Sequence, residues 1–289
     1  MRCDDELDAA GCWPNVRSKM KSIPLRLHVL FLCVLFATSS FSQDVPENKY
    51  FDSDGTRIRY IETGDGVPVI ALHGFTMDSN SMLNRFSDLA KNHRLILFDL
   101  RGHGLSDKPH TVAGYGREMG HDVIRLMDHL NISKAHLLGY SLGVVPIPMV
   151  ITENESRFIS VVFVGGAARW EWGEDLDRLY QGRYEKLMRT TPQELLDRGL
   201  EGQDPVALAN LRLGQKQLIV SKQSLSDLKI PILAIVGSED PALEEVQNFK
   251  TTFPKLELNV MEGQTHRSVI QHPKFIERVQ AFFSSTQEN

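Results

Sequence analysis

The sequence predicts an α/β protein with a mostly parallel sheet, helices on both faces of the sheet, and a helical insertion between two strands. From residue 49 onward, short β-rich runs alternate with longer segments of helical pattern. This alternation stops between residues 169 and 226, where no strand pattern is found. At 289 residues, 42% of them hydrophobic and 24% charged, the chain can bury the core that such a sheet requires.

Seven runs are expected to form strands of the sheet. They are residues 57–62, 67–72, 94–98, 135–138, 159–164, 230–236 and 256–260.

Three segments show the apolar spacing of amphipathic helices, namely 79–91, 121–130 and 268–283. Residues 169–226 also place aromatic and leucine residues at helical spacing. We expect residues 169–226 to form a helical cap, and residues 43–168 and 227–289 to form the core that carries it.

The first 42 residues are typical of a secretory signal peptide. Lys19, Lys21 and Arg26 precede an apolar run at residues 27–37, and small and polar residues follow it. The apolar run is shorter than the roughly 20 residues that a membrane-spanning helix needs, so no stable membrane anchor is expected. We therefore predict export to the periplasm or the medium after cleavage near Ser42, which the N-terminal sequence of the mature chain would test.

Two features of this N-terminal segment affect the mature chain. An acidic cluster within residues 1–19 is unusual ahead of a signal, so Met20 is an alternative translation start. All three cysteines, Cys3, Cys12 and Cys33, precede the cleavage site. The mature protein is expected to contain no disulfide.

Composition argues against several classes of function. The formal net charge is −5, and no basic stripe suggests a nucleic-acid partner. No cluster of His, Cys and Glu has the spacing of metal ligands, so no metal or other cofactor is expected. The Gly64-Asp65-Gly66 turn precedes a strand and not a helix, so it is not a phosphate-binding loop.

The motif Gly139-Tyr140-Ser141-Leu142-Gly143 lies where the run at 135–138 gives way to a helical segment. A sharp strand-to-helix turn exposes a serine in a strained backbone conformation, and glycines two residues away on either side relieve the crowding. Ser141 is therefore the candidate nucleophile.

An acid and a histidine follow Ser141 in the order that this chemistry needs. Asp240 comes after the run at 230–236, and His266 comes after the run at 256–260. Serine attacks at neutral pH only when an imidazole removes its proton, and the imidazole needs an acceptor behind it. The adjacent Glu239 competes with Asp240 for the role of acid, although the spacing favours Asp240.

The segment His73-Gly74-Phe75 follows the run at 67–72. Glycine lets the backbone bend there, so the amides of Phe75 and Leu142 can form a pair of donors for an oxyanion. The glycine-rich loop at residues 99–107 is expected to support the site. His73 and His103 are expected to have structural roles.

With these motifs in order, the chain resembles an α/β-hydrolase-fold enzyme of the capped, single-domain kind from about residue 50 to residue 283. The resemblance implies an eight-stranded sheet. It also implies Ser141 as nucleophile, Asp240 as acid, His266 as base, and the Phe75 and Leu142 amides as the oxyanion hole. Serine at residue 141 argues against the haloalkane dehalogenase and epoxide hydrolase branches, which carry aspartate there.

The chain departs from this family where Val144-Val145-Pro146-Ile147-Pro148 replaces an alanine-rich helix start. Proline removes a backbone donor, so Pro146 and Pro148 are expected to shorten or kink the helix after Ser141. The turn at Ser141 is expected to survive, because amides in the first helical turn need no partner within the helix.

The sequence thus predicts an exported serine hydrolase that cleaves a small carboxylic ester through an acyl-enzyme. A C–C bond hydrolase, a lactonase and a perhydrolase of the same fold remain alternatives. A non-catalytic ligand-binding protein is the alternative from a different class.

Overall fold

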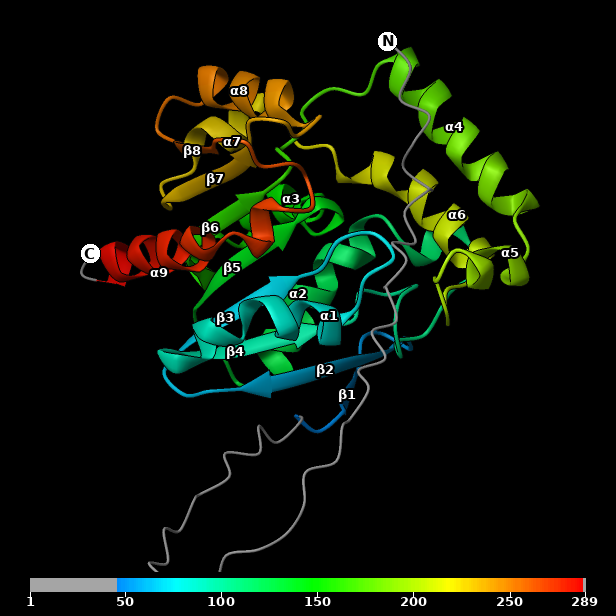
Figure 1. The fold of residues 1–289 in the computed structure, drawn as a ribbon, viewed down its shortest axis with the longest axis horizontal. Coiled ribbons are helices and arrows are strands. Elements are labelled where there is room, and N and C mark those ends of the chain that lie inside the picture. The colour runs from blue at the N-terminus through cyan, green and yellow to red at the C-terminus, as the bar shows by residue number, and fades with distance from the viewer. Residues whose placement is uncertain (1–45, 288–289) are drawn as a thin grey trace, which may run out of the picture. The chain divides into compact units, whose positions relative to one another are not determined.

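The computed structural model describes residues 46–287, and their centre is one eight-stranded sheet in the order β1-β2-β4-β3-β5-β6-β7-β8 (Figure 1). The predicted signal peptide, its cleavage site and all three cysteines lie outside the described residues. The strands are β1 (Lys49–Asp52), β2 (Arg57–Thr63), β3 (Val67–Leu72), β4 (His93–Phe98), β5 (Ala135–Tyr140), β6 (Phe158–Val164), β7 (Ile232–Gly237) and β8 (Glu257–Met261).

The sheet is mostly parallel, as the alternation of strands and helices predicts. The strands from β4 through β3, β5, β6 and β7 to β8 pair in parallel, whereas β2 pairs antiparallel with both β4 and β1. All seven predicted strands are present, and their bounds differ from the predicted ones by at most two residues. The eighth strand, β1, is missing from the seven predicted runs because its four residues bury only Phe51.

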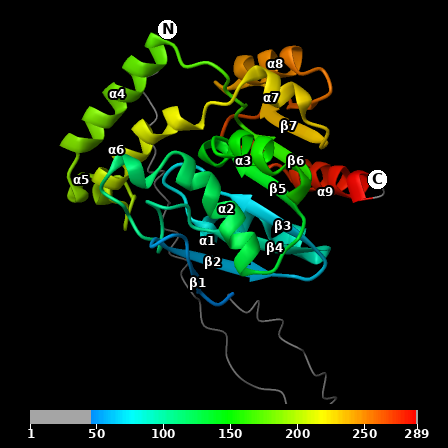
Figure 2. The same ribbon diagram turned by 180° about the vertical axis from the view of Figure 1, so that it is seen from behind.

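Two hydrophobic cores cover the two faces of the sheet, because successive strand residues point to opposite faces. On one face, α2 (Arg117–His129), α3 (Ile147–Asn154) and α8 (Leu243–Thr252) contribute buried residues. On the other face, α1 (Ser79–Phe86) and α9 (Pro273–Gln287) pack on the strands. Figures 1 and 2 show these two helical layers from opposite sides.

The three predicted helices are present with shifted ends. The segment predicted at 79–91 is α1 followed by a 3₁₀ turn at Ser87–Lys91. The helix predicted at 121–130 is α2, which begins earlier, at Arg117. The last helix begins at Pro273 rather than at residue 268, which suits proline because the first helical residue needs no amide donor.

Between β6 and β7 the chain is helical, with α4 (Glu174–Arg189), α5 (Pro192–Asp197), α6 (Pro205–Gly214) and α7 (Lys222–Asp227). A small cluster of Leu187, Leu195, Leu208 and Ala209 joins α4, α5 and α6. By contrast, α7 contacts α3 and buries Leu225 in the main core. We refer to residues 169–226 as the cap.

Candidate active site

The candidate residues lie on loops at the carboxyl edge of the parallel strands. Ser141 follows β5, Asp240 follows β7, and His266 follows β8, while Phe75 lies just beyond β3. Because neighbouring parallel strands end at the same edge of the sheet, residues far apart in the sequence meet there.

Ser141 has the strained backbone expected of a sharp turn after a strand. Its φ is 53°, a left-handed value that few residues other than glycine adopt. A Cβ at Gly139 would lie 2.5 Å from the Gly143 carbonyl oxygen, and a Cβ at Gly143 would lie 2.3 Å from the Leu72 carbonyl oxygen. The glycines therefore relieve crowding with each other and with β3.

Ser141, His266 and Asp240 form a continuous hydrogen-bonded chain. His266 Nε2 lies 2.8 Å from Ser141 Oγ. On the other side of the ring, His266 Nδ1 lies 2.9 Å from Asp240 Oδ2 and 3.1 Å from Oδ1. With Nδ1–H donating to the carboxylate, Nε2 is left to accept the Ser141 hydroxyl proton. This is the geometry that a serine needs to become a nucleophile.

Asp240, and not Glu239, is the acid that lies against His266. The Asp240 side chain is completely buried and also accepts a hydrogen bond of 2.8 Å from the Ala242 amide, whereas Glu239 is exposed. Gly165, at the end of β6, makes room for the pair. A Cβ there would lie 3.0 Å from His266 Nδ1 and 3.2 Å from Asp240 Oδ2.

Tyr140 is a further site residue that the sequence analysis does not single out. Its ring stacks on that of His266 with centroids 5.4 Å apart, and its hydroxyl donates a hydrogen bond of 3.0 Å to the His266 carbonyl oxygen. Burial, together with the nearby Asp240 carboxylate, raises the pKa of Tyr140 to about 12, so the phenol stays a donor at neutral pH. The only sequence signal is its place between Gly139 and Ser141.

The segments that carry the two predicted oxyanion donors lie side by side. Leu142 is the second residue of a 3₁₀ turn, Ser141–Val144, and that turn contacts β3. Phe75 lies three residues beyond the end of β3. The Phe75 and Leu142 amides therefore belong to adjacent loops at the same edge of the sheet as Ser141.

The two prolines shorten the helix after Ser141, as predicted. The chain forms the 3₁₀ turn at Ser141–Val144, and α3 then begins at Ile147 with Pro146 as its N-cap. Pro148 lies in the first turn of α3, where its missing amide leaves no hydrogen bond unmade. The turn at Ser141 is retained.

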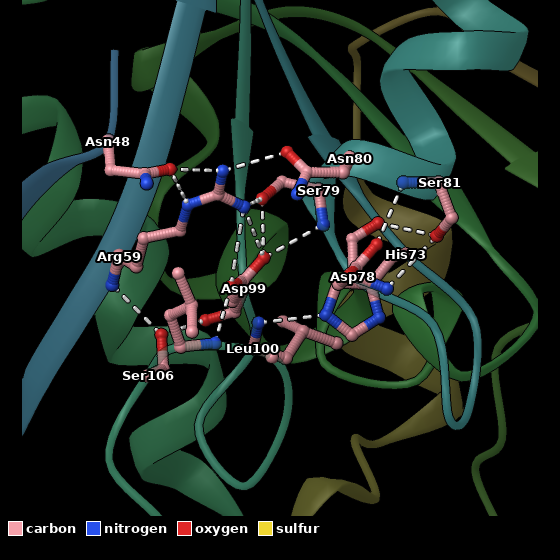
Figure 3. Close-up of polar contacts among 12 residues, drawn as sticks. Asn48, Arg59, His73, Asp78, Ser79, Asn80, Ser81, Asp99, Leu100 and Ser106 are labelled. Atoms are coloured by element: carbon pink, nitrogen blue, oxygen red, sulfur yellow. Dashed lines mark hydrogen bonds and ion pairs between the residues drawn. The ribbon is translucent and has the colours of Figure 1, made fainter. Parts of the chain in front are cut away.

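A buried network supports the loops next to the site (Figure 3). Asp99 lies at the end of β4, and its side chain is completely buried with Arg59 Nη1 at 3.2 Å. It also accepts hydrogen bonds of 2.8 Å from the amides of Ser79 and Leu105. The Asp99 carboxylate thus joins β2, the start of α1 and the glycine-rich loop at 99–107.

His73 contacts this loop and His103 belongs to it, and both occupy structural positions. His73 Nε2 accepts a hydrogen bond of 2.9 Å from the Leu100 amide, and its Nδ1 lies 2.8 Å from the Gly74 carbonyl oxygen. Burial lowers the pKa of His73 and takes the pKa of His103 well below its usual range. His103 Nδ1 makes one long contact of 3.4 Å within its loop, and within residues 46–287 its Nε2 has no hydrogen-bond partner.

Residues 46–287 contain no group of three or more His, Cys, Asp or Glu side chains that is arranged to hold a metal ion. No helix of this part of the chain is long and apolar enough to span a bilayer. A surface pocket on α4 is lined by Trp172, Tyr180 and Lys216 among others, but Ser141, Asp240 and His266 are not part of it.

Comparison with known families decides the classification of this fold. The family model described as the alpha/beta hydrolase fold matches residues 67–216, which is more than half of the chain. The chain belongs to the α/β-hydrolase fold family. This match extends from β3 to the end of α6, and so includes the Ser141 turn, the Asp99 loop and much of the cap.

Individual relatives of this α/β hydrolase differ in activity. It is 26% identical over 227 residues to 3-oxoadipate enol-lactonase 1 from Acinetobacter baylyi, a match covering 69% of this chain and 82% of the relative. A shorter match, 42% identical over 91 residues, is to the dihydrolipoyllysine-residue acetyltransferase component of an acetoin cleaving system from Pseudomonas putida. That match covers 31% of this chain and only 24% of the relative, so the chain spans about a quarter of that protein's length.

Solved structures agree on the fold. A thermophilic esterase from Thermogutta terrifontis superimposes with a TM-score of 0.71, covering 83% of this chain and 99% of the esterase at 21% sequence identity. At this identity the likeness establishes the architecture. The reaction must be argued from the site itself.

Proposed function

We propose that this α/β hydrolase cleaves a small carboxylic ester through a covalent acyl-enzyme formed on Ser141. The observation that carries the proposal is the hydrogen-bonded chain in which His266 lies 2.8 Å from Ser141 Oγ and 2.9 Å from Asp240. Activating a serine requires a base within hydrogen-bond reach and an acceptor that orients the base.

In the first half of the reaction, Ser141 Oγ attacks the ester carbonyl carbon while His266 Nε2 takes the hydroxyl proton. The carbonyl oxygen becomes an oxyanion, for which the Phe75 and Leu142 amides are the proposed donors. When the bond to the leaving alcohol breaks, His266 returns the proton to the alcohol oxygen. Asp240 remains ionised and stabilises the imidazolium.

In the second half, water replaces the alcohol. His266 takes a proton from the water, the hydroxide attacks the acyl carbon, and the bond to Ser141 Oγ breaks as His266 returns the proton to Ser141. The carboxylic acid then leaves. Side chains of the protein and water supply every group that this sequence of steps needs, so the proposal includes no cofactor.

A lactone substrate is the second candidate, because a lactone is a cyclic ester and the relative from Acinetobacter baylyi is named a lactonase. The same nucleophile, base and oxyanion donors would open the ring. A panel of linear esters, thioesters and lactones would separate the two substrate classes.

The first prediction tests the nucleophile. Ser141→Ala should lower the rate of ester hydrolysis at least about 10³-fold, because the variant lacks the oxygen that attacks the substrate. It should also abolish covalent labelling by a fluorophosphonate probe. Ser226→Ala is the matched control, because Ser226 is exposed on α7 and its hydroxyl donates to the Lys222 carbonyl oxygen of the same helix.

Unchanged hydrolysis in Ser141→Ala would refute the proposed mechanism. Absence of probe labelling in the wild-type protein, combined with measurable binding of a small ligand, would instead favour a non-catalytic binding protein.

A further inference from the structure

The turn that carries Phe75 is strained and depends on contacts from outside itself. The Met77 amide donates to the Gly74 carbonyl oxygen at 3.1 Å, which closes the turn over Phe75 and Thr76. Thr76 has a φ of 60°, a value that costs conformational free energy in a β-branched residue. Such a conformation persists only where the surrounding structure holds it.

Two cap side chains contact this turn directly. The Arg212 guanidinium carbon lies 3.7 Å from the centroid of the Phe75 ring, a close cation–π contact. Gln203 Nε2 donates a long hydrogen bond of 3.4 Å to the Thr76 carbonyl oxygen. Phe75 also packs against the small apolar cluster that joins α4, α5 and α6.

The helix that carries Arg212 is itself fixed to the core. Asp204 caps the start of α6 by accepting from the Val206 and Ala207 amides, and it lies 2.7 Å from His110 Nε2 of the core. The body of α6 also contacts the 3₁₀ turn at Val112–Gly114. The helix that carries Arg212 is therefore fixed to the core both at its start and along its length.

On the core side, Phe75 contacts a buried histidine. The rings of Phe75 and His103 meet edge to face with centroids 5.8 Å apart, and His103 meets His73 in the same way at 5.0 Å. Since burial holds His103 neutral, its ring does not repel the permanent positive charge of Arg212. The Phe75 ring is thus contacted both by the cap and by the core.

We propose that Arg212 is a positioning residue that holds the Phe75 turn, and with it the Phe75 amide, in the conformation that stabilises the oxyanion. The inference rests on the proposed function, because it gives the cap a part in the chemistry of the Ser141 site. Arg212 acts here through the Phe75 ring and the backbone attached to it, and makes no contact with the reacting atoms.

This role predicts an effect on turnover more than on substrate binding. An oxyanion donor contributes chiefly in the transition state, and a misplacement of about 1 Å can lower a rate about 10²-fold. Arg212→Gln should therefore lower kcat about 10- to 100-fold and change KM less than about threefold. Arg212→Lys should recover only part of the loss, because an ammonium group keeps the charge but lacks the planar face that stacks on a ring.

The experiment measures kcat, KM and the rate of fluorophosphonate labelling for wild type, Arg212→Gln and Arg212→Lys, with thermal melting to verify folding. Arg178→Gln is the matched control, because it removes one cap arginine whose side chain is 71% exposed and, within residues 46–287, pairs only with residues of its own helix. A Phe75→Leu background completes a double-mutant cycle. In that background, Arg212→Gln should change kcat less than about twofold, because the ring through which Arg212 acts is gone.

Hydrogen exchange of a peptide covering residues 74–77 provides a readout that does not depend on activity. We expect faster exchange in Arg212→Gln than in wild type, and wild-type exchange in Arg178→Gln. Unchanged exchange in Arg212→Gln would overturn the inference, even if the wild-type protein proved inactive and the proposed function failed. A different result would overturn the inference and leave the proposed function standing. In that case the wild type is active and labelled by the probe, but Arg212→Gln raises KM at constant kcat in both the wild-type and the Phe75→Leu backgrounds. This would indicate that Arg212 contacts the substrate directly.

Discussion

At Ser141 the backbone takes a left-handed conformation, and this is possible because the residues two positions away have no side chain. The Gly139 and Gly143 backbones approach each other and the end of β3 too closely for a Cβ. A single methyl group at residue 143 would displace either the Leu72 carbonyl or the turn that holds Ser141. Glycine is therefore required at residues 139 and 143 by backbone contacts rather than by the chemistry of the site.

This crowding gives a residue-scale prediction about two glycines. Gly143→Ala should lower the free energy of unfolding by about 1–3 kcal/mol, because close-packed backbone must shift to admit the methyl group. It should lower ester hydrolysis at the same time, since the shift moves Ser141. Gly182→Ala, on α4 with nothing within 4 Å of its added Cβ, should instead stabilise the protein by about 0.5–1 kcal/mol. Urea denaturation would measure the free energy of unfolding of both variants. Equal changes in Gly143→Ala and Gly182→Ala would contradict the role of the close contact between Gly143 and Leu72.

At the scale of elements, the Asp99 carboxylate fixes the position of three segments that meet near the site. Figure 3 shows Arg59 of β2 and Ser79 at the start of α1 converging on it. The Ser79 amide is one of the donors at the start of a helix that have no partner within the helix. The buried Asp99 carboxylate accepts its hydrogen bond and interacts favourably with the positive end of the helix dipole. This arrangement ties the start of α1 to the end of β4 and to β2.

Removing the Asp99 charge should leave Arg59 buried without its counter-ion. Asp99→Asn is therefore expected to lower the free energy of unfolding by about 3–5 kcal/mol. Asp107→Asn serves as the comparison, because Asp107 pairs with Arg57 at 3.8 Å and both side chains are largely exposed. Asp107→Asn should lower the free energy of unfolding by less than about 1 kcal/mol. Chemical denaturation of both variants measures the difference, and a loss below about 1 kcal/mol in Asp99→Asn would show that this ion pair is not needed for stability.

For the molecule as a whole, the sheet and most of the candidate site could be predicted because they depend on patterns local in the sequence. Apolar runs and helical periodicity are visible in the chain, and so is the order of Ser141, Asp240 and His266. The short strand β1 could not be predicted, since its pairing with β2 and not its own composition makes it a strand.

Side-chain contacts between distant segments could not be predicted either. The sequence leaves Glu239 and Asp240 as competing acids, and only the end of β7 decides which carboxylate turns inward toward His266. The stacking of Tyr140 on His266 and of Arg212 on Phe75 depends on how the end of a strand, two loops and a helix pack. Such contacts follow from tertiary structure and leave no local pattern.

The core also contains histidines that fold in the neutral form, and these should make the stability of the protein depend on pH. Burial lowers the pKa of His136 from 6.5 to about 3, and it lowers the pKa of His73 and His103 as well. Below pH 6.5 the unfolded chain binds a proton at each of these sites that the folded chain does not bind. The free energy of unfolding should therefore be highest above this pH and should fall as the pH is lowered, until the folded protein also takes up the proton.

The contribution of His136 alone to this pH dependence is large enough to measure. Once the pH is well below 6.5, His136 should lower the free energy of unfolding by about 1.4 kcal/mol for each pH unit. His136→Gln keeps an amide that can hydrogen-bond to Ser160, which now lies 2.7 Å from His136 Nδ1, but it cannot titrate. The slope of unfolding free energy between pH 6 and pH 4 should therefore be shallower in this variant by about that amount. Equal slopes in wild type and His136→Gln would mean that His136 takes up its proton in the folded state as readily as in the unfolded chain.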